Sequence, residues 1–166
     1  EVGFYGVRKL RDLARSSDTR PWMLTVSFTH PHDPYVARRQ HWDRYDHDSI
    51  DLPKIGALPV AGSDTHNHRL RNVSDMDAMP VDEAQVRNAR HAYYSSIAYV
   101  DDWVGTLVQT LATCGMADDT VVIFTADHGD MLGERGLWYK LNFFEHASRV
   151  PLVFSGPGVS QGRSPE

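Results

Sequence analysis

An apolar run that ends in two polar side chains limits the folds open to this chain. Residues 120–126 read TVVIFTA, and Asp127, His128 and Gly129 follow directly. A run of β-branched and aromatic residues is typical of a strand that is covered on both faces. In open α/β sheets, ligands bind at the carboxyl ends of such strands. We therefore expect a carboxylate and an imidazole at a ligand-binding edge, where they suit a metal ion.

Lys140 brings a cation to the same place. It follows through residues 130–139 (DMLGERGLWY), in which Gly133 and Gly136 allow the chain to fold back on itself. The ammonium group of Lys140 is then expected to return toward Asp127 and His128. A carboxylate, an imidazole and a fixed cation together favour an anionic oxygen ester as the ligand.

The strand candidates indicate the fold class. Besides residues 120–126, residues 22–29 (WMLTVSFT) and 150–155 (VPLVFS) have the composition of central strands. Strands that are apolar on both sides need neighbouring strands and helices on each face, more than this chain supplies. We therefore predict an α/β fold with a mostly parallel sheet flanked by helices. It is expected to be incomplete in this chain, with residues 1–166 as the middle portion of one larger domain.

Two helices are predicted beside these strands. Apolar residues recur at helical spacing over residues 2–15 and, in a longer helix, over residues 81–113. Asp82 is the expected N-cap of the long helix, and Gly115 is its expected stop. Residues 36–81 are expected to be largely irregular, as either a functional cover or a disordered insert.

Composition excludes some classes of partner. The net charge is −5 and no long cluster of lysine and arginine is present, which argues against a nucleic-acid surface. No apolar run is long enough to span a membrane. Cys114 is the single cysteine, so an intrachain disulfide is excluded and a reducing, cytoplasmic compartment is favoured over the periplasm. At the end of a helix and without an evident histidine base, this thiol is expected to be packed and inert.

A second candidate for catalysis lies in the loop HPHDPY at residues 30–35. Its prolines make the loop stiff enough to hold an imidazole in place after a predicted strand. One of its two histidines, His30 or His32, is therefore a catalytic candidate. The alternative is that both histidines only form hydrogen bonds to the long loop that follows.

Other polar clusters have ordinary explanations. Asp64, His66 and His68 alternate as zinc ligands would in an extended segment, but polar residues in a polar loop are common. Asp101 and Asp102 are adjacent on the predicted long helix, where their side chains diverge by about 100° and favour solvation over a shared ion. Nine histidines in 166 residues leave a rival interpretation open, a non-catalytic histidine-rich metal-binding module.

These segments together carry a family resemblance. The string from Asp127 to Lys140 (DHGDMLGERGLWYK) resembles the second signature of the sulfatases in the alkaline phosphatase superfamily. Residues 27–35 (SFTHPHDPY), 99–102 (YVDD) and 144–152 (FEHASRVPL) agree with the same family in the same order. Within the family, the sequence is most similar to choline-sulfatases, notably at residues 8–15 and 45–53.

The resemblance implies a role for each matching residue. Asp127 and His128 would be ligands of one divalent metal ion, usually Ca²⁺, and the softness of the His128 imidazole keeps Mn²⁺ as an alternative. Lys140 would bind the sulfate oxygens. His32 would lie near the leaving group, whereas His30 would only support the loop.

The remaining implications concern the whole protein. Asp130, Glu134 and Arg149 would be scaffold residues, with Glu134 also a candidate for supporting the metal ligands. The family nucleophile, a formylglycine made from the cysteine of Cys-x-Pro-Ser-Arg, would lie upstream, so the chain alone is expected to be inactive. The expected full-length activity is hydrolysis of choline O-sulfate, a small-molecule sulfate ester, by a homo-oligomer. The alternatives are a phosphonate monoester or phosphodiester hydrolase of the same superfamily, or a pseudoenzyme.

A choline headgroup calls for aromatic rings around its quaternary ammonium. Aromatic residues near a buried loop more often serve packing, so none is assigned to the headgroup. The aromatic residues considered are Trp42, Tyr45, Trp138, Tyr139, Phe143 and Phe144.

Overall fold

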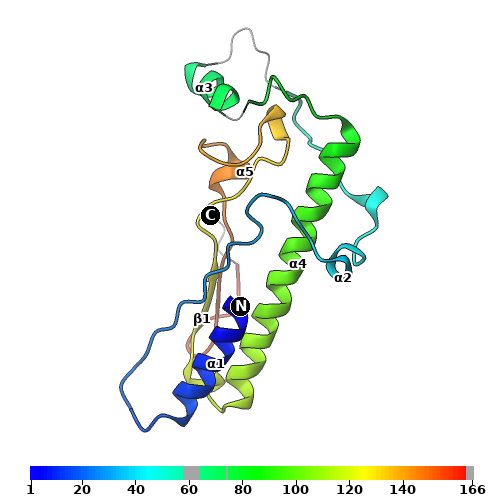
Figure 1. Ribbon diagram of the computed structural model, residues 1–166. Coiled ribbons are helices and arrows are strands. Elements are labelled where there is room, and N and C mark those ends of the chain that lie inside the picture. The colour runs from blue at the N-terminus through cyan, green and yellow to red at the C-terminus, as the bar shows by residue number, and fades with distance from the viewer. Residues whose placement is uncertain (58–63, 74, 164–166) are drawn as a thin grey trace. The chain divides into compact units, whose positions relative to one another are not determined.

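The computed structural model describes residues 1–57, 64–73 and 75–163. The helices are α1 (Val2–Arg15), α2 (Arg39–Trp42), α3 (Thr65–Val73), α4 (Glu83–Thr113) and α5 (Glu145–Ser148), and the strands are β1 (Val122–Thr125) and β2 (Leu152–Ser155) (Figure 1).

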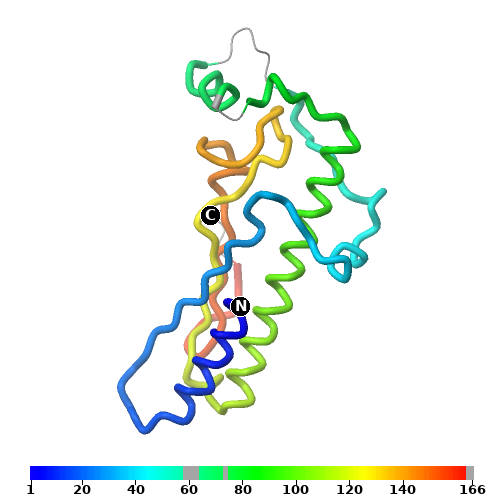
Figure 2. The backbone as a smooth tube through the Cα atoms, viewed as in Figure 1, coloured from blue at the N-terminus to red at the C-terminus, as the bar shows by residue number. Residues whose placement is uncertain are grey.

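The chain divides into two compact units. The first unit contains residues 1–30, 98–125 and the described residues from Pro151 onward, and the second contains residues 31–97 and 126–150. Helix α4 is a single unbroken path in the backbone trace and contributes residues to both units (Figure 2). The four residues that the family resemblance assigns to catalysis or metal binding, His32, Asp127, His128 and Lys140, belong to the second unit.

The long helix α4 begins and ends where local signals place it. The Asp82 carboxylate accepts a hydrogen bond from the backbone N–H of Gln85 at 2.8 Å, and the Gln85 side chain accepts one from the N–H of Asp82 at 2.8 Å. This reciprocal pair is a capping box, which satisfies N–H groups that the first turn leaves free. At the other end, Gly115 takes a left-handed φ of 69°. Both predicted boundary residues are confirmed.

Two glycines allow α1 to pack closely in the first unit. The predicted helix over residues 2–15 is confirmed as α1, which buries Gly3, Gly6 and Leu10. A Cβ atom on Gly3 would lie 2.1 Å from the ring of Trp103 on α4. A Cβ atom on Gly6 would lie 3.0 Å from Leu107, also on α4. The two helices therefore pack through positions that have no room for larger side chains.

The sheet differs from the predicted one. β1 and β2 form a two-stranded antiparallel sheet in which Val122 pairs with Ser155 and Thr125 pairs with Leu152. Both strands expose apolar side chains, with Ile123 57% and Leu152 62% exposed. The expectation of parallel strands covered on both faces is therefore wrong for this pair, because the described residues of the first unit provide no further strand beside it.

Residues 22–29 also depart from the prediction, because they form no strand in the structure. An extended segment becomes a strand only when a neighbour accepts and donates its backbone hydrogen bonds. The described part of the chain offers residues 22–29 no such neighbour.

The expectation of a largely irregular segment at residues 36–81 is wrong in part. Its described residues contain α2, a short 3₁₀ helix (His47–Ser49) and α3. The part of this prediction that covers residues 58–63 and 74 lies outside the described residues. No helix in the described ranges is long and apolar enough to cross a membrane.

Candidate functional site

The turn after β1 holds the two predicted metal ligands and depends on a close backbone contact. The N–H of Gly129 donates a hydrogen bond to the carbonyl of Ala147 at 2.7 Å. A Cβ atom at this position would lie 2.0 Å from the backbone oxygen of His146. Glycine is therefore required at position 129 by the approach of another backbone segment.

Replacing Gly129 with alanine should destabilise the protein. The new methyl group would overlap a backbone oxygen, which cannot turn away as a flexible side chain can. We therefore expect the free energy of unfolding to fall by about 3 kcal/mol, as for a severe overpacking change. Chemical denaturation of the full-length protein would measure it. Gly105→Ala is the matched control, because nothing lies within 4 Å of its Cβ position on α4. Equal stability of the two variants would contradict the contact.

Asp127 and His128 turn donor atoms toward each other. One Asp127 oxygen, Oδ1, accepts the backbone N–H of His128 at 2.9 Å. The Nδ1 atom of His128 lies 2.8 Å from the carbonyl of Gly129, so Nδ1 carries the proton and Nε2 keeps its lone pair. That Nε2 lies 3.7 Å from the other Asp127 oxygen, Oδ2.

This geometry fits part of a metal site. Metal bonds to carboxylate oxygen and imidazole nitrogen are about 2.0–2.6 Å long, so one divalent ion fits between donors 3.7 Å apart. The carbonyl of Gly129 fixes the His128 ring, as such partners commonly do for metal-binding histidines. No group of three or more metal-binding side chains occurs in the described ranges, so this pair supplies an incomplete shell.

Lys140 and His32 form a second pair, and the structure brings them together across 108 residues of chain. The Nζ atom of Lys140 lies 2.5 Å from Nε2 of His32 and 3.7 Å from a carboxylate oxygen of Asp33. Nδ1 of His32 lies 2.7 Å from the carbonyl of Asp33, so this nitrogen donates and Nε2 accepts from the lysine. The pair presents an ammonium group and an imidazole nitrogen at one point.

The structure does not join the two pairs directly. Within the described residues, neither Asp127 nor His128 forms a hydrogen bond or ion pair with Lys140 or His32. Both pairs are partly open to solvent, with the side chain of His128 38% exposed and that of Lys140 24% exposed. His30, the other histidine of the loop, belongs to the first unit and packs its ring against Tyr99 at 4.8 Å between centroids.

The loop between the two pairs is anchored by a buried carboxylate. Glu134 is only 2% exposed and accepts hydrogen bonds from the backbone N–H groups of Lys54 and Ile55 at 2.9–3.0 Å. Arg90 on α4 lies 3.8 Å from Glu134 and donates to the carbonyl of Leu132 at 3.0 Å. These contacts agree with a scaffold role for Glu134.

The other two scaffold candidates differ in burial. Asp130 is half-buried, and burial raises the pKa of its carboxyl, partly offset by hydrogen bonds from the backbone of Leu132 and from Tyr35. Arg149 is exposed and lies 3.8 Å from Glu145 one helical turn earlier. An exposed pair of this kind contributes little to stability.

The rival zinc cluster is not formed. Asp64 accepts hydrogen bonds from the backbone of His66 and Asn67 at the start of α3, as a capping residue does. His66 and His68 are two positions apart on a helix, so their side chains diverge. His66 instead places Nε2 2.8 Å from the carbonyl of Leu141. The extended segment that zinc binding would need is therefore absent from these residues.

The unassigned aromatic residues mainly pack against other rings. Trp42 stacks on the buried His91 at 3.6 Å between centroids, and Tyr45 meets the same ring edge-on. Trp138 and Tyr139 pack beside Tyr35. Phe143 is almost fully exposed, whereas Phe144 packs against the core cluster of Met131, Leu137 and Ala147.

Asp101 and Asp102 are exposed on α4, as expected, and the Cys114 thiol is partly buried.

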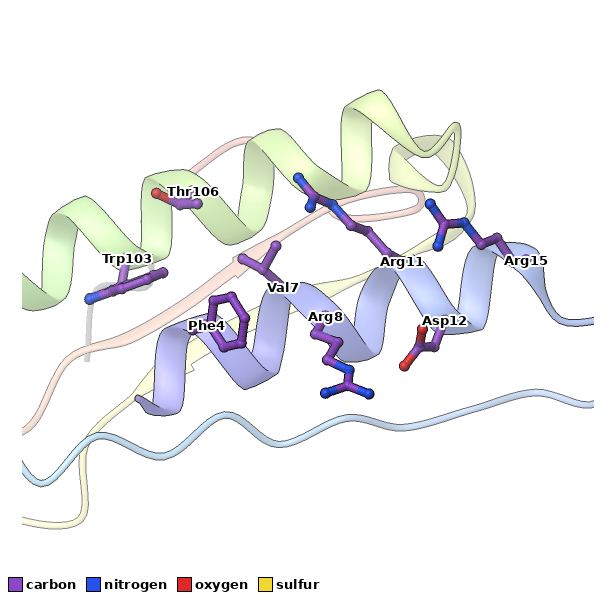
Figure 3. Close-up of a pocket in the computed structure, with 8 residues that line it drawn as sticks. All are labelled: Phe4, Val7, Arg8, Arg11, Asp12, Arg15, Trp103 and Thr106. Carbon is purple, nitrogen blue, oxygen red and sulfur yellow. The ribbon is translucent and has the colours of Figure 1, made fainter.

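A groove in the first unit contains none of the candidate residues. It is lined along α1 by Phe4, Val7, Arg8, Arg11, Asp12 and Arg15, and along α4 by Trp103 and Thr106 (Figure 3). It holds no histidine and only one carboxylate, so it lacks the donors of a metal site.

Comparison with known proteins identifies the family of this chain. A profile of the sulfatase family matches residues 7–165. The chain belongs to the sulfatase family. Choline-sulfatase of Rhizobium meliloti (strain 1021) is 50% identical to this sulfatase chain over 165 residues, which are 98% of this chain and 32% of that protein. Iduronate 2-sulfatase of Homo sapiens is 33% identical over 150 residues, which are 83% of this chain and 27% of that protein.

Solved structures agree on the fold. The phosphonate monoester hydrolase from Silicibacter pomeroyi matches with a TM-score of 0.80 at 24% identity, covering 96% of this chain and 33% of that one. The phosphonate monoester hydrolase of Agrobacterium radiobacter matches with a TM-score of 0.71 at 26% identity, covering 95% of this chain and 33% of that one. The sulfatase chain thus spans about a third of the length of these relatives.

Some contacts around the candidate site were not predicted from the sequence. Asp33 lies beside both Lys140 and His32, and Tyr35 donates a hydrogen bond to Asp130. Burial, together with the Asp130 carboxylate, raises the pKa of Tyr35, so its hydroxyl remains a donor. Both residues belong to the loop that the sequence singled out, Asp33 directly before Pro34 and Tyr35 directly after it, and this setting was the available signal.

Proposed function

We propose that the full-length protein hydrolyses sulfate esters and that its substrate is choline O-sulfate. The observation that carries the proposal is the contact between Lys140 Nζ and His32 Nε2, formed inside a sulfatase chain that is 50% identical to a choline-sulfatase. An ammonium group and an imidazole nitrogen that meet at one point suit an ester with charged peripheral oxygens and a poor leaving group.

Lys140 and His32 would divide the work on the ester. When the S–O bond to the alcohol breaks, negative charge develops on the leaving oxygen, and a protonated His32 can supply the proton from Nε2. Lys140 would bind the peripheral sulfate oxygens, exchanging its contact with His32 for contacts with the substrate. The carbonyl of Asp33 holds the other ring nitrogen and so keeps Nε2 directed at this point.

Asp127 and His128 would hold one divalent ion, Ca²⁺ or alternatively Mn²⁺, through Oδ2 and Nε2. When bound, the ion would neutralise sulfate oxygen charge. The remaining ligands and the formylglycine nucleophile would come from other parts of the full-length protein. We further propose that β1 and residues 22–29 belong there to a larger, mostly parallel sheet flanked by helices.

The proposal is tested by turnover of two substrates with the full-length protein. We expect a higher kcat/KM for choline O-sulfate than for an aryl phosphonate monoester. The reverse order would favour the phosphonate monoester hydrolase alternative, which the fold alone also accommodates. Turnover of neither substrate, in a protein with bound metal, would indicate a pseudoenzyme. Elemental analysis of the same preparation distinguishes Ca²⁺ from Mn²⁺.

A further inference from the structure

The carboxylate of Asp130 lies where three segments of the candidate site meet. Its Oδ2 atom accepts the hydroxyl hydrogen of Tyr35 at 2.9 Å. Its Oδ1 atom accepts the backbone N–H groups of Leu132 at 3.0 Å and Tyr139 at 3.1 Å. Asp130 itself follows His128 by two residues. One side chain is therefore bonded to the His32 loop and to the loop that ends at Lys140.

The backbone around Lys140 needs such an anchor. Leu132, Tyr139 and Leu141 have positive φ values of 45°, 65° and 73°, although none is glycine. Residues held in sparsely populated backbone regions cost about 1–3 kcal/mol each and persist only where surrounding contacts hold them. Asp130 binds the N–H of two of these three residues, one of which immediately precedes Lys140.

The His32 loop is tied to the same carboxylate by a single hydroxyl group. Tyr35 follows His32 by three residues, with Pro34 between them limiting the freedom of the chain. Its ring lies among those of Tyr93, Trp138 and Tyr139 at 6.0–6.3 Å between centroids. Removing the hydroxyl would leave this packing in place and release only the bond to Asp130.

We propose that Asp130 is a positioning residue that sets two groups at once, His32 through the Tyr35 hydroxyl and Lys140 through the N–H of Tyr139. The expected kinetic effects of Asp130 rest on the proposed sulfate-ester hydrolysis. The positions of His32 and Lys140 can be measured in a structure, whatever the substrate is.

Tyr35→Phe in the full-length protein tests the positioning of His32. Its bond serves the His32 loop, and displacement of a proton donor weakens catalysis most where the leaving group needs the proton. We expect kcat for an alkyl sulfate to fall about tenfold, with a much smaller fall for an activated aryl sulfate and little change in KM. Tyr94→Phe is the matched control, because it removes a tyrosine hydroxyl bonded to Asp51 at 2.6 Å. In this control, any fall in kcat should be the same for alkyl and aryl sulfates.

Asp130→Ala and Asp130→Asn test the positioning of Lys140. Alanine removes every bond of the carboxylate, so both classes of sulfate ester should be turned over more slowly and with a higher KM. Asparagine keeps an oxygen that can accept the two backbone N–H groups and should restore most of the turnover of aryl sulfates. If asparagine restored no more than alanine, the anchoring of Lys140 through this oxygen would be wrong.

A crystal structure of full-length Tyr35→Phe completes the test. We expect the contact between Lys140 Nζ and His32 Nε2 to lengthen or break. An unchanged contact would overturn the proposal, as would an equal fall for alkyl and aryl sulfates. Failure of the wild-type protein to hydrolyse either sulfate would instead count against the proposed function, and the structural comparison would still decide the role of Asp130.

Discussion

Lys140→Ala in the full-length protein is expected to lower kcat/KM for choline O-sulfate by about 10²- to 10³-fold, as loss of one preorganised electrostatic contact does in other enzymes. The cause would be loss of the ammonium group that lies 2.5 Å from His32 Nε2, where the sulfate oxygens are proposed to bind. Because this cation would bind the ester both before and during the reaction, KM should rise as well as kcat fall. Steady-state kinetics over a range of substrate concentrations separates the two effects.

Two further variants sharpen this result. Lys140→Arg keeps the charge but replaces a compact ammonium with a planar guanidinium, so it should recover only a small part of the loss. Lys54→Ala is the matched control, because the exposed side chain is removed while the backbone N–H that binds Glu134 remains. Wild-type kcat/KM in Lys140→Ala would contradict the role of this residue.

His32→Ala is expected to affect alkyl sulfates far more than activated aryl sulfates. An alkyl alkoxide leaves poorly without a proton, and general acid catalysis is worth about 10²- to 10⁴-fold, so the fall for choline O-sulfate should lie in that range. An aryl sulfate with an acidic phenol needs less help and should lose less. The measurement is the rate for a series of sulfate esters whose leaving groups differ in pKa. The rate should depend more steeply on the leaving-group pKa in His32→Ala than in the wild-type protein.

His30→Ala provides the control from the same loop. Its ring packs on Tyr99 rather than on Lys140, so its replacement should change stability without changing the dependence on the leaving group. An equal loss for alkyl and aryl sulfates in His32→Ala would remove His32 from the leaving-group side of the site.

The helices were predictable because their signals are local. Asp82 and Gln85 are three residues apart, and the contacts that start α4 are formed between them. The stop at Gly115 likewise depends on one residue that tolerates a positive φ. By contrast, α3 lies in a polar segment whose composition indicated a loop, and Asp64 gave its only clear start signal.

The strand pairing was less accessible from sequence because it is a non-local property. The apolar runs placed β1 and β2 within a few residues, but nothing in either run specifies which neighbour it pairs with or in which direction. The antiparallel register of Ile123 with Phe154 emerges only when both strands are seen together.

The candidate site was predicted in its components rather than in its connections. The residue pattern singled out Lys140, the family resemblance chose His32 over His30, and the structure places Lys140 and His32 in contact. The bond between Tyr35 and Asp130 joins residues that are 95 positions apart, and no spacing rule relates them. Such contacts depend on how loops fold against each other, which the sequence does not display as a pattern.

The exposed apolar side chains of β1 and β2 have a practical consequence for work with this chain on its own. Within the described residues, β1 and β2 pair only with each other, and the outer edges of such a ribbon can template the addition of strands from other molecules. Ile123, Phe124 and Phe154 would make such addition favourable, since it also removes apolar surface from water. Expressed without the rest of the protein, residues 1–166 would tend to aggregate and to form inclusion bodies. Kinetic measurements therefore need the longer polypeptide.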